Sequence, residues 1–339
     1  MVDTAAFQNC SMLREVLCRP TTPPEVGNAA FNGNAPGRKI YVLDASVSLY
    51  KASQYWSNYT DDICSENDKP AAYDSVPVPE DKYPSKTDFK RRILLTQFTG
   101  TGCGFCPRII NALYQLNNSD NADDVVLSAA HLYNSGDPAY LSSATGLASS
   151  LNITAYPRVC ADLNKNAMTN STYESILSLI SDANNRTSVK GGIAVNSVYN
   201  AETNTICINT LVKAKESAEF RVGAWLLEDG VYGQQSNNNI APLEGVDFDI
   251  HNNCIRSAYS SLTPYDFTGF PLGTIEAGKT ASMEFVFTLK PNGTGSQNNW
   301  NHDNLRLIVF ISTKEDTGWH VNNVVKVPKN GSVDFEYTE

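Results

Sequence analysis

The feature that most constrains this chain is a pair of cysteines, separated by two residues, where a strand-like run meets a helix-like run. Residues 93–98 are mostly apolar and predict a short buried strand, and residues 103–107 then read Cys-Gly-Phe-Cys-Pro. Pro107 suits the first turn of a helix, where its missing N–H has no intrahelical partner. Apolar residues recur behind it at helical spacing, namely Ile109, Ala112, Leu113 and Leu116. Cys103 is therefore predicted at the helix N-terminus, where unpaired N–H groups and the helix dipole stabilise a thiolate, and Cys106 one turn inside, close enough to form a disulfide with it.

The stretch around this pair alternates strands with helices. Further strands are predicted at 125–127 and 158–161. The dipeptide Asp137-Pro138 is typical of an N-cap followed by a first-turn proline, and residues 171–174 (Ser-Thr-Tyr-Glu) match a capping box. The residues expected on the buried faces of these two helices are Tyr140, Ala144, Leu147, Leu151, Tyr173, Ile176, Leu177 and Ile180. Such alternation predicts βαβ units around a central sheet.

Beyond about residue 189 the period of the apolar pattern changes to two. Met283, Phe285, Phe287 and Leu289 occupy alternate positions, as expected of a half-buried strand. Other strand-like runs cover 192–198, 205–212, 220–227, 305–312 and 321–327. Turn-forming residues separate several of these runs, which predicts an antiparallel β-sandwich. The expected architecture is an α/β domain over residues 89–188 followed by an all-β antiparallel sandwich over residues 189–339.

Residues 1–88 are rich in Pro, Gly, Asn and Asp and show no sustained period, so their fold stays open between β and irregular structure. Within them, residues 40–43 and 47–50 are strand candidates. The run 76–84 predicts an extended linker, since each of its prolines removes a hydrogen-bond donor and disfavours helix in the preceding residue. We therefore expect an N-terminal segment and linker ahead of the two domains.

Charge and composition limit the classes of function. The formal net charge of −10 argues against binding to a nucleic-acid backbone, which requires a basic surface. No apolar run approaches the ~18 residues of a membrane-spanning helix. Residues 1–19 have neither the basic start nor the apolar stretch of a secretory signal, so the chain is either cytosolic or exported by a signal outside this sequence. Abundant Asn, Thr, Ser and Tyr favour export.

The cysteine pair has three chemical interpretations. As a redox pair, Cys103 is the nucleophilic thiolate and Cys106 is the resolving thiol. As half of a zinc site the pair would need further ligands, and the sequence has neither a second Cys-x-x-Cys nor a nearby pair of histidines. The third interpretation is a structural disulfide in a domain without activity. We expect no metal and no cofactor, and the choice between redox pair and structural bridge stays open.

The region around the pair resembles the thioredoxin superfamily. Residues 153–157 (Ile-Thr-Ala-Tyr-Pro) match the stretch that ends in the superfamily's cis-proline, opposite the cysteines. The resemblance implies a cis bond before Pro157 and a backbone edge at Tyr156 that docks an extended substrate strand. Two positions depart from the superfamily: Gly102 stands where Trp usually precedes the first cysteine, and Gln97 stands where a buried Asp moves protons. Both departures weaken the case for fast reductase activity.

Residues 94–100 and 103–107, with the later run 250–256 (Ile-His-Asn-Asn-Cys-Ile-Arg), resemble the outer membrane protein 28 family of Bacteroidetes. The resemblance extends over about residues 89–330. It implies a thioredoxin-like domain joined to a C-terminal β-sandwich and a location in the periplasm, the outer membrane or the cell surface. Members are often lipoproteins, which leaves room for a lipid anchor outside this sequence. The family brings location and architecture rather than a reaction.

Several other side chains have both a functional and a structural interpretation. His131 ends the second predicted strand, at the sheet edge that borders active sites in α/β proteins, and is a candidate for tuning the thiolate together with Gln97. Cys160 is interpreted as a buried small residue or as a third thiol near the pair, and His251 and Arg256 as sandwich structure. The pairing of the other cysteines stays open for Cys10, Cys18, Cys64, Cys160, Cys207 and Cys254. Four aromatic residues are candidates for a carbohydrate platform or for core: Trp225, Tyr232, Trp300 and Trp319.

The expected function is an exported thiol–disulfide oxidoreductase or redox-active envelope protein that uses Cys103 and Cys106. Tyr156 and Pro157 would hold the substrate, and the partners would be protein thiols or disulfides of the envelope. The alternative is a non-enzymatic outer-membrane or surface protein, in which the thioredoxin-like unit is a scaffold and the sandwich binds a protein or a glycan. The intact cysteine pair favours the enzyme, and the two departures from the superfamily favour the alternative.

Overall fold

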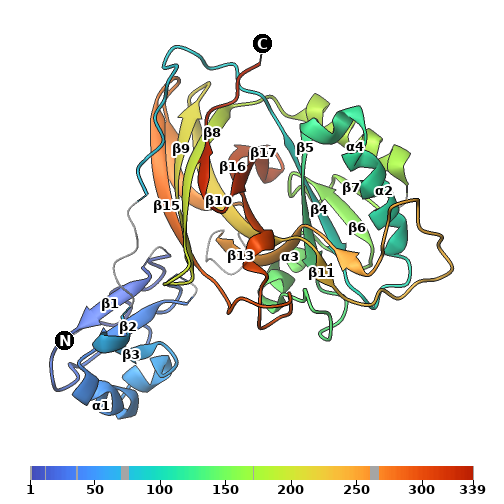
Figure 1. Cartoon of the computed structure of the whole chain (residues 1–339). Helices are drawn as coiled ribbons and strands as arrows, with labels where there is room; N and C mark the ends of the chain where they lie inside the picture. The colour runs from blue at the N-terminus through green and yellow to red at the C-terminus, as the bar shows by residue number, and fades with distance from the viewer. Residues whose placement is uncertain are drawn as a thin grey trace. The chain divides into compact units, whose positions relative to one another are not determined.

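The computed structural model describes residues 2–11, 13–35, 37–69, 76–170, 172–259 and 267–338, and the chain divides into two compact units (Figure 1). One is built from Met1–Tyr73, and the other from Asp74–Ser260 with Phe267–Glu339. The predicted linker at 76–84 belongs to the second unit, so the boundary predicted at residue 88 is placed too late. The linker is held there by side chains of the sandwich: Asn209 Nδ2 donates to the Val76 carbonyl oxygen at 3.1 Å.

The N-terminal unit contains a parallel three-stranded sheet and a short helix. The sheet order is β1 (Glu15–Cys18), β2 (Lys39–Val42) and β3 (Ile63–Ser65), and the helix is α1 (Val47–Ala52). The strand predicted at 40–43 is therefore confirmed, but the strand predicted at 47–50 is wrong. Val47 and Tyr50, which are three residues apart, face the core, whereas Leu49 is exposed, and this is a helical pattern.

The larger unit is built on a nine-stranded sheet. Its order is β17–β16–β10–β13–β5–β4–β6–β7, and β14 pairs with β10 as well. β4 and β5 are parallel neighbours, and β6 runs antiparallel to β4. The strands are β4 (Ile93–Thr99), β5 (Val125–His131), β6 (Arg158–Ala161), β7 (Met168–Thr169), β10 (Ala218–Glu228), β13 (Cys254–Tyr259), β14 (Phe270–Ile275), β16 (Leu305–Glu315) and β17 (Gly318–Pro328).

A backbone contact joins the predicted α/β region to the predicted sandwich within this sheet. β13 lies parallel to β5, with Cys254 opposite Ala129, and the Ala129 N–H donates to the Asn253 carbonyl oxygen at 2.7 Å. The boundary predicted between residues 188 and 189 therefore separates two parts of one continuous sheet and not two compact units. Pairing between strands so far apart in sequence leaves no trace in the local period of either part.

A second, antiparallel sheet of four strands packs against the β16–β17 end of the first (Figure 1). Its order is β15 (Thr280–Thr288), β9 (Thr205–Ala214), β8 (Gly191–Asn200) and β18 (Gly331–Val333). Each strand predicted at 192–198, 205–212, 220–227, 305–312 and 321–327 falls within an observed strand. The change of period at residue 189 is thus confirmed as a change to mainly antiparallel sheet.

Two longer helices pack against one face of the β4–β5–β6 part of the large sheet. They are α2 (Pro107–Asn117) and α4 (Tyr173–Arg186), and their buried residues form one core cluster with Ile93, Leu95 and Leu127. The predicted buried face of α2 is confirmed, since Ile109, Ala112, Leu113 and Leu116 are all buried. No helix among the described residues is long and apolar enough to cross a bilayer.

The starts of the other two predicted helices need correction. The Asp137 carboxylate accepts the Ala139 N–H at 2.8 Å and so caps a turn, while α3 (Thr145–Ser150) begins only later. The capping box of α4 is formed by Thr172 and Ser175, one residue further on than predicted, and Ser171 lies outside the described residues. In both cases the motif correctly marks capped backbone, but the residue that begins the helix differs.

Candidate functional site

The candidate site is the loop between β4 and α2. Cys103 and Cys106 are joined by a disulfide, with their Cα atoms 5.4 Å apart. Pro107 is the first residue of α2 and Cys106 is its N-cap, so Cys103 lies ahead of the helix, and the prediction of Cys106 one turn inside it is wrong. After reduction, the unpaired N–H groups and the dipole of the helix would favour a thiolate at this end. The predicted catalytic roles of the two cysteines stay predictions.

A segment that lies far along the chain covers this loop. Residues 233–238, here called the cover segment, follow β11 (Val231–Tyr232), which pairs with β12 (Ile250–His251). Backbone N–H groups of the cover segment donate to the loop: Ser236 donates to the Thr101 carbonyl oxygen at 2.7 Å, and Asn238 donates to that of Gly104 at 2.9 Å. Two backbone hydrogen bonds therefore attach the cover segment to the disulfide loop.

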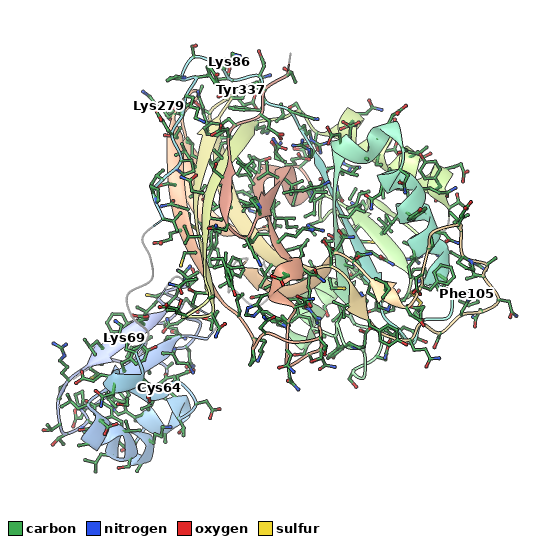
Figure 2. All side chains as sticks on the ribbon, viewed as in Figure 1. Cys64, Lys69, Lys86, Phe105, Lys279 and Tyr337 are labelled. Carbon is green, nitrogen blue, oxygen red and sulfur yellow. A yellow bond between two sulfur atoms is a disulfide. The ribbon has the colours of Figure 1, made fainter. Side chains whose placement is uncertain are left out.

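A buried side chain closes the same contact. Gln235 Nε2 lies 2.9 Å from the Cys103 carbonyl oxygen and 3.1 Å from that of Thr101. Cys103 is 2 % exposed and Cys106 is fully buried, whereas Phe105 between them is 48 % exposed and lies at the surface in Figure 2. Reactive cysteines are ordinarily partly accessible. In the folded protein, an incoming thiol therefore meets Phe105 and the cover segment at the surface, and both sulfur atoms lie beneath it.

A side chain at position 102, directly before Cys103, would be crowded by two neighbouring side chains. A Cβ atom at Gly102 would lie 3.0 Å from Asn134 Oδ1 and 3.2 Å from Tyr133 Cδ1. The Gly102 N–H donates to the same Asn134 oxygen at 2.8 Å. Both residues belong to the loop after β5, which occupies the space that a larger side chain at position 102 would need.

The predicted docking residues lie near this loop. The Tyr156–Pro157 peptide bond is cis. The Tyr156 ring packs edge-on against Tyr133, with ring centroids 5.6 Å apart, and Tyr133 lies beside Gly102. Tyr133 thus connects the turn before Pro157 to the cysteine loop. Substrate docking at Tyr156 and Pro157 stays a prediction.

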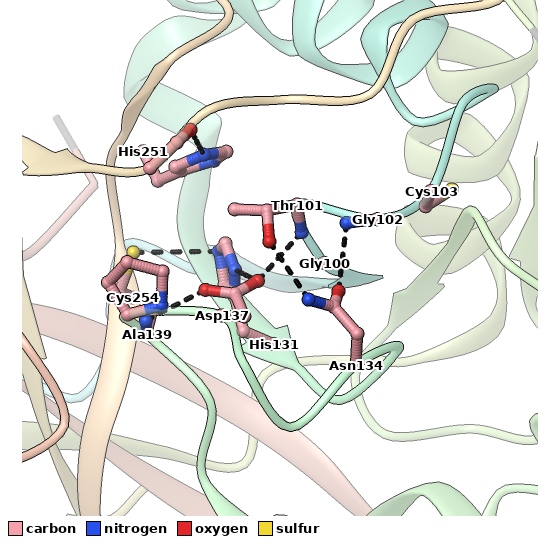
Figure 3. Close-up of polar contacts among 12 residues, drawn as sticks. Gly100, Thr101, Gly102, Cys103, His131, Asn134, Asp137, Ala139, His251 and Cys254 are labelled. Atoms are coloured by element: carbon pink, nitrogen blue, oxygen red, sulfur yellow. Dashed lines mark hydrogen bonds and ion pairs between the residues drawn. The ribbon is translucent and has the colours of Figure 1, made fainter.

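His131 turns its ring nitrogens toward partners other than the cysteine pair (Figure 3). Nδ1 is 2.8 Å from Asp137 Oδ2, and Nε2 is 3.6 Å from Cys254 Sγ. Asp137 Oδ2 also accepts the Thr101 N–H at 2.7 Å, close before Cys103 in the chain. Any influence of His131 on Cys103 would pass through Asp137 and the loop backbone, so the tuning role stays a prediction.

This cluster holds three buried groups with displaced pKa values. Burial acts to lower the pKa of His131, but interaction with Cys254 and the hydrogen bond to Asp137 outweigh burial and raise it above its usual value. Burial acts to raise the pKa of Asp137, but the hydrogen bond and charge of His131 lower it to about 2. Burial and the charge of His131 lower the pKa of His251 to about 4. The two imidazole rings, with centroids 5.0 Å apart, therefore differ in charge at neutral pH.

Two members of this cluster are not predicted by the sequence, from which His251 is interpreted as sandwich structure and the pairing of Cys254 stays open. His251 instead packs edge-on against His131, and its Nε2 lies 2.9 Å from the Gly233 carbonyl oxygen at the start of the cover segment. The available signal was the run 250–256, which supplies both residues through β12 and β13. Arg256 of the same run is structural, since it forms a buried ion pair with Glu228 at 2.7 Å.

The remaining candidates lie away from the loop. Gln97 is buried in the wall of a cavity beside α2. Cys160 is buried on β6, and burial raises the pKa of its thiol, which favours the structural interpretation. A carbohydrate platform that includes Trp225 and Trp300 is wrong, because both side chains are buried. Within the described residues, no group of three or more His, Cys, Asp or Glu side chains is arranged to hold a metal ion.

Fold and site together define a class of protein: a strand-rich chain in which a strand–helix region with a Cys-x-x-Cys disulfide shares one sheet with an antiparallel sandwich. The family model of the outer membrane protein Omp28 matches residues 144–332, which is more than half of the chain. The chain therefore belongs to the Omp28 outer membrane protein family. Membership indicates a location in the outer membrane or the wider cell envelope.

Solved structures that match this chain include the following two. HBP35 of Porphyromonas gingivalis is 15 % identical with a TM-score of 0.55, over 75 % of this chain and 80 % of that chain, and at this identity the likeness shows the fold. Spo0M, a sporulation control protein from Bacillus subtilis, is 15 % identical with a TM-score of 0.22, over 44 % of this chain and 51 % of that chain. No curated protein matches the sequence.

Proposed function

We propose that this chain is an envelope protein with a thioredoxin-like region over residues 89–188 that performs thiol–disulfide exchange through Cys103 and Cys106. The observation that carries the proposal is the disulfide between these residues at the N-terminus of α2. The parallel β4–β5 pair supports the thioredoxin-like interpretation.

Exchange starts from the reduced pair. The Cys103 thiolate attacks one sulfur of a substrate disulfide, the other substrate sulfur leaves as a thiolate and takes up a proton, and Cys103 is left in a mixed disulfide. Cys106 loses its proton and attacks the Cys103 sulfur, which releases the second substrate thiol and restores the Cys103–Cys106 bond. Two electrons pass to the substrate, and the reverse sequence oxidises a substrate dithiol.

The cover segment sets a condition for this chemistry. Because Cys103 is buried, a protein substrate reaches its sulfur once the hydrogen bonds from Ser236 and Asn238 to the loop open. The backbone at Tyr156 and Pro157 then holds the substrate strand. The substrates are protein thiols or disulfides of the envelope.

The burial of the pair favours a second candidate function. In it the chain is a non-enzymatic surface protein, Cys103–Cys106 is a structural bridge, and the sandwich binds a protein or a glycan. Gln97 fits this candidate, because an amide cannot take up a proton where the thioredoxin superfamily uses an Asp.

Trapping distinguishes the two functions. Cys106→Ser should accumulate a mixed disulfide on Cys103 when it is mixed with a disulfide-bonded peptide, because no thiol remains to release it. Cys103→Ser is the matched control and should accumulate much less, because Cys106 is the more deeply buried sulfur. Mass spectrometry of the unreduced protein measures both.

The reduction potential of the wild-type pair is the second measurement. A potential above about −300 mV together with trapping on Cys103 supports exchange, because structural bridges lie below that value. A potential below it, with no trapping in either variant, supports the structural bridge and overturns the exchange function.

A further inference from the structure

A cavity of about 360 Å³ lies at the C-terminal ends of β4 and β5, between α2 and residues 245–253. This volume falls in the range of small-molecule sites in proteins. Its apolar lining consists of Ile110, Leu113, Tyr114, Leu127, Val246 and Ile250. Its polar lining includes Gln97, Thr99, His131 and His251.

The strand register explains why polar groups line this cavity. Alternate residues of a strand point to one face of the sheet. On β4, Ile93 and Leu95 pack into the core under α2 and α4, and Gln97 and Thr99, which continue the same face, line the cavity instead. The face therefore changes from apolar to polar where the core ends and the cavity begins.

Two of these polar groups have unused hydrogen-bonding capacity. Gln97 is 7 % exposed and Thr99 is 2 % exposed. In the part of the chain that the structure describes, Gln97 Nε2 and Thr99 Oγ1 have no hydrogen-bond partner. A buried polar group without a partner costs roughly 1–3 kcal/mol. The Gln97 amide nitrogen can only donate and the Thr99 hydroxyl can donate as well as accept, so one acceptor group from outside the chain would satisfy both atoms.

The charge of His131 in the lining is balanced by the buried Asp137 carboxylate, 2.8 Å from its Nδ1, so the choice of ligand rests on the unpartnered polar atoms. His131 carries its proton, because Asp137 and Cys254 raise its pKa, whereas His251 is neutral, because burial and the charge of His131 lower its pKa. The acidic residue among the lining side chains is Asp247, which is exposed and therefore hydrated. The inner wall thus offers two unpartnered polar atoms, and the lining combines the apolar residues above with further polar side chains, namely His251, Asn117, Asn252 and Asn253.

We propose that this cavity binds a small amphiphilic carboxylate. Its carboxylate accepts hydrogen bonds from Gln97 Nε2 and Thr99 Oγ1, and its hydrocarbon part packs against Leu113, Tyr114 and the other apolar lining residues. The site is separate from the disulfide loop and does not depend on thiol exchange.

Calorimetric titration of the full chain, with its disulfide intact, tests the proposal. Octanoate is the probe, and octylammonium, which has the same tail and a head with no acceptor, is the comparison. Octanoate should bind saturably at one site and octylammonium should not. Thr99→Val removes one donor at nearly constant volume and should weaken octanoate binding about tenfold, the loss of one hydrogen bond to a charged group.

Two further variants complete the test. Ile110→Trp fills the cavity and should abolish binding, while Thr145→Val makes the same chemical change as Thr99→Val at an exposed residue of α3 and should leave binding unchanged. Thermal unfolding checks that each variant is folded. If Ile110→Trp is not folded, the test rests on Thr99→Val alone. Absence of saturable octanoate binding, equal binding of octylammonium, or unchanged binding by Thr99→Val overturns the proposal. None of these outcomes bears on trapping at Cys103.

Discussion

Two buried glutamines, Gln235 and Gln97, differ in the hydrogen bonds that their side-chain nitrogens make. Gln235 Nε2 faces carbonyl oxygens of the Cys103 loop, although its Oε1 atom has no partner among the described residues. Gln97 Nε2 lines a cavity and has no partner in that same part of the chain. The first glutamine uses its donors to hold the disulfide loop closed from within the chain. The second has a donor that is available to a bound ligand.

Of the predictions that follow, replacement of Asp137, which holds the Thr101 end of the disulfide loop, should have the largest effect on stability. Asp137 is fully buried, pairs with His131 and accepts the N–H groups of Thr101 and Ala139. Asp137→Ala leaves a buried imidazolium without its counterion, so the free energy of unfolding should fall by about 3–5 kcal/mol. Urea denaturation at neutral pH measures this loss.

The control for this variant is Asp247→Ala, which removes an exposed carboxylate from the cavity lining and should change stability by less than about 0.5 kcal/mol. If Asp137→Ala costs no more than Asp247→Ala, the cluster does not hold the Thr101 end of the loop.

The second prediction concerns pH and the neutral histidine beside this cluster. In the folded protein the pKa of His251 is lowered from 6.5 to about 4, so the unfolded chain binds more protons between these values. Stability from His251 is therefore complete above pH 6.5 and is lost as the pH falls toward 4, by about 3 kcal/mol at most. Asp137, with its pKa lowered to about 2, stays charged across this window.

His251→Gln tests this window, because the amide does not titrate and can still donate to the Gly233 carbonyl oxygen that His251 Nε2 contacts. The variant should be about as stable as the wild type near pH 7 and more stable than it near pH 4.5. Urea midpoints at the two pH values measure the difference. An equal decline in both proteins would mean that His251 does not resist protonation in the fold.

The fold was predictable wherever the information is local. The apolar run at 93–98, the helical spacing after Pro107 and the period of two beyond residue 189 each correspond to an observed strand, helix or sheet. The parallel pairing of Cys254 with Ala129 could not be predicted, because neither residue carries a local sign of its partner. The short run at 47–50 fits a strand and a helix equally well by period, and burial of Tyr50 decides for the helix.

The candidate site divides in the same way. Cys103, Cys106 and Pro157 were recognisable because their motifs are contiguous in sequence. The cover segment was not, since residues 233–238 are a polar run that predicts only a loop, and its pairing with Thr101 and Gly104 is tertiary. The change of β4 from apolar to polar at Gln97 was visible in the sequence, but the cavity that it lines was not.

The third prediction concerns Gln235, the glutamine that holds the cover segment against the disulfide loop. Gln235→Ala removes the donor that lies near the carbonyl oxygens of Cys103 and Thr101, and stability should fall by about 1 kcal/mol. The disulfide should then be reduced by dithiothreitol several-fold faster, because the cover segment is held less tightly. Gln234→Ala, the same substitution at the neighbouring exposed position of the cover segment, is the control. Equal reduction rates in both variants would show that Gln235 does not limit access to the sulfurs.

The smallest expected effect concerns the cavity that Gln97 lines. It is measured by comparing two threonines of β4. The Thr96 hydroxyl accepts a hydrogen bond from Ser128 Oγ at 3.0 Å, so Thr96→Val should cost about 1 kcal/mol or more. The Thr99 hydroxyl has no such partner in the described residues, so Thr99→Val should be neutral or stabilise the ligand-free protein by up to about 1 kcal/mol. Urea denaturation of both variants without added ligand measures the difference. If Thr99→Val is as destabilising as Thr96→Val, the Thr99 hydroxyl already has a partner such as a bound water. The polar groups of the cavity would then be hydrogen-bonded without a ligand, as the carbonyl oxygens of the disulfide loop are by Gln235.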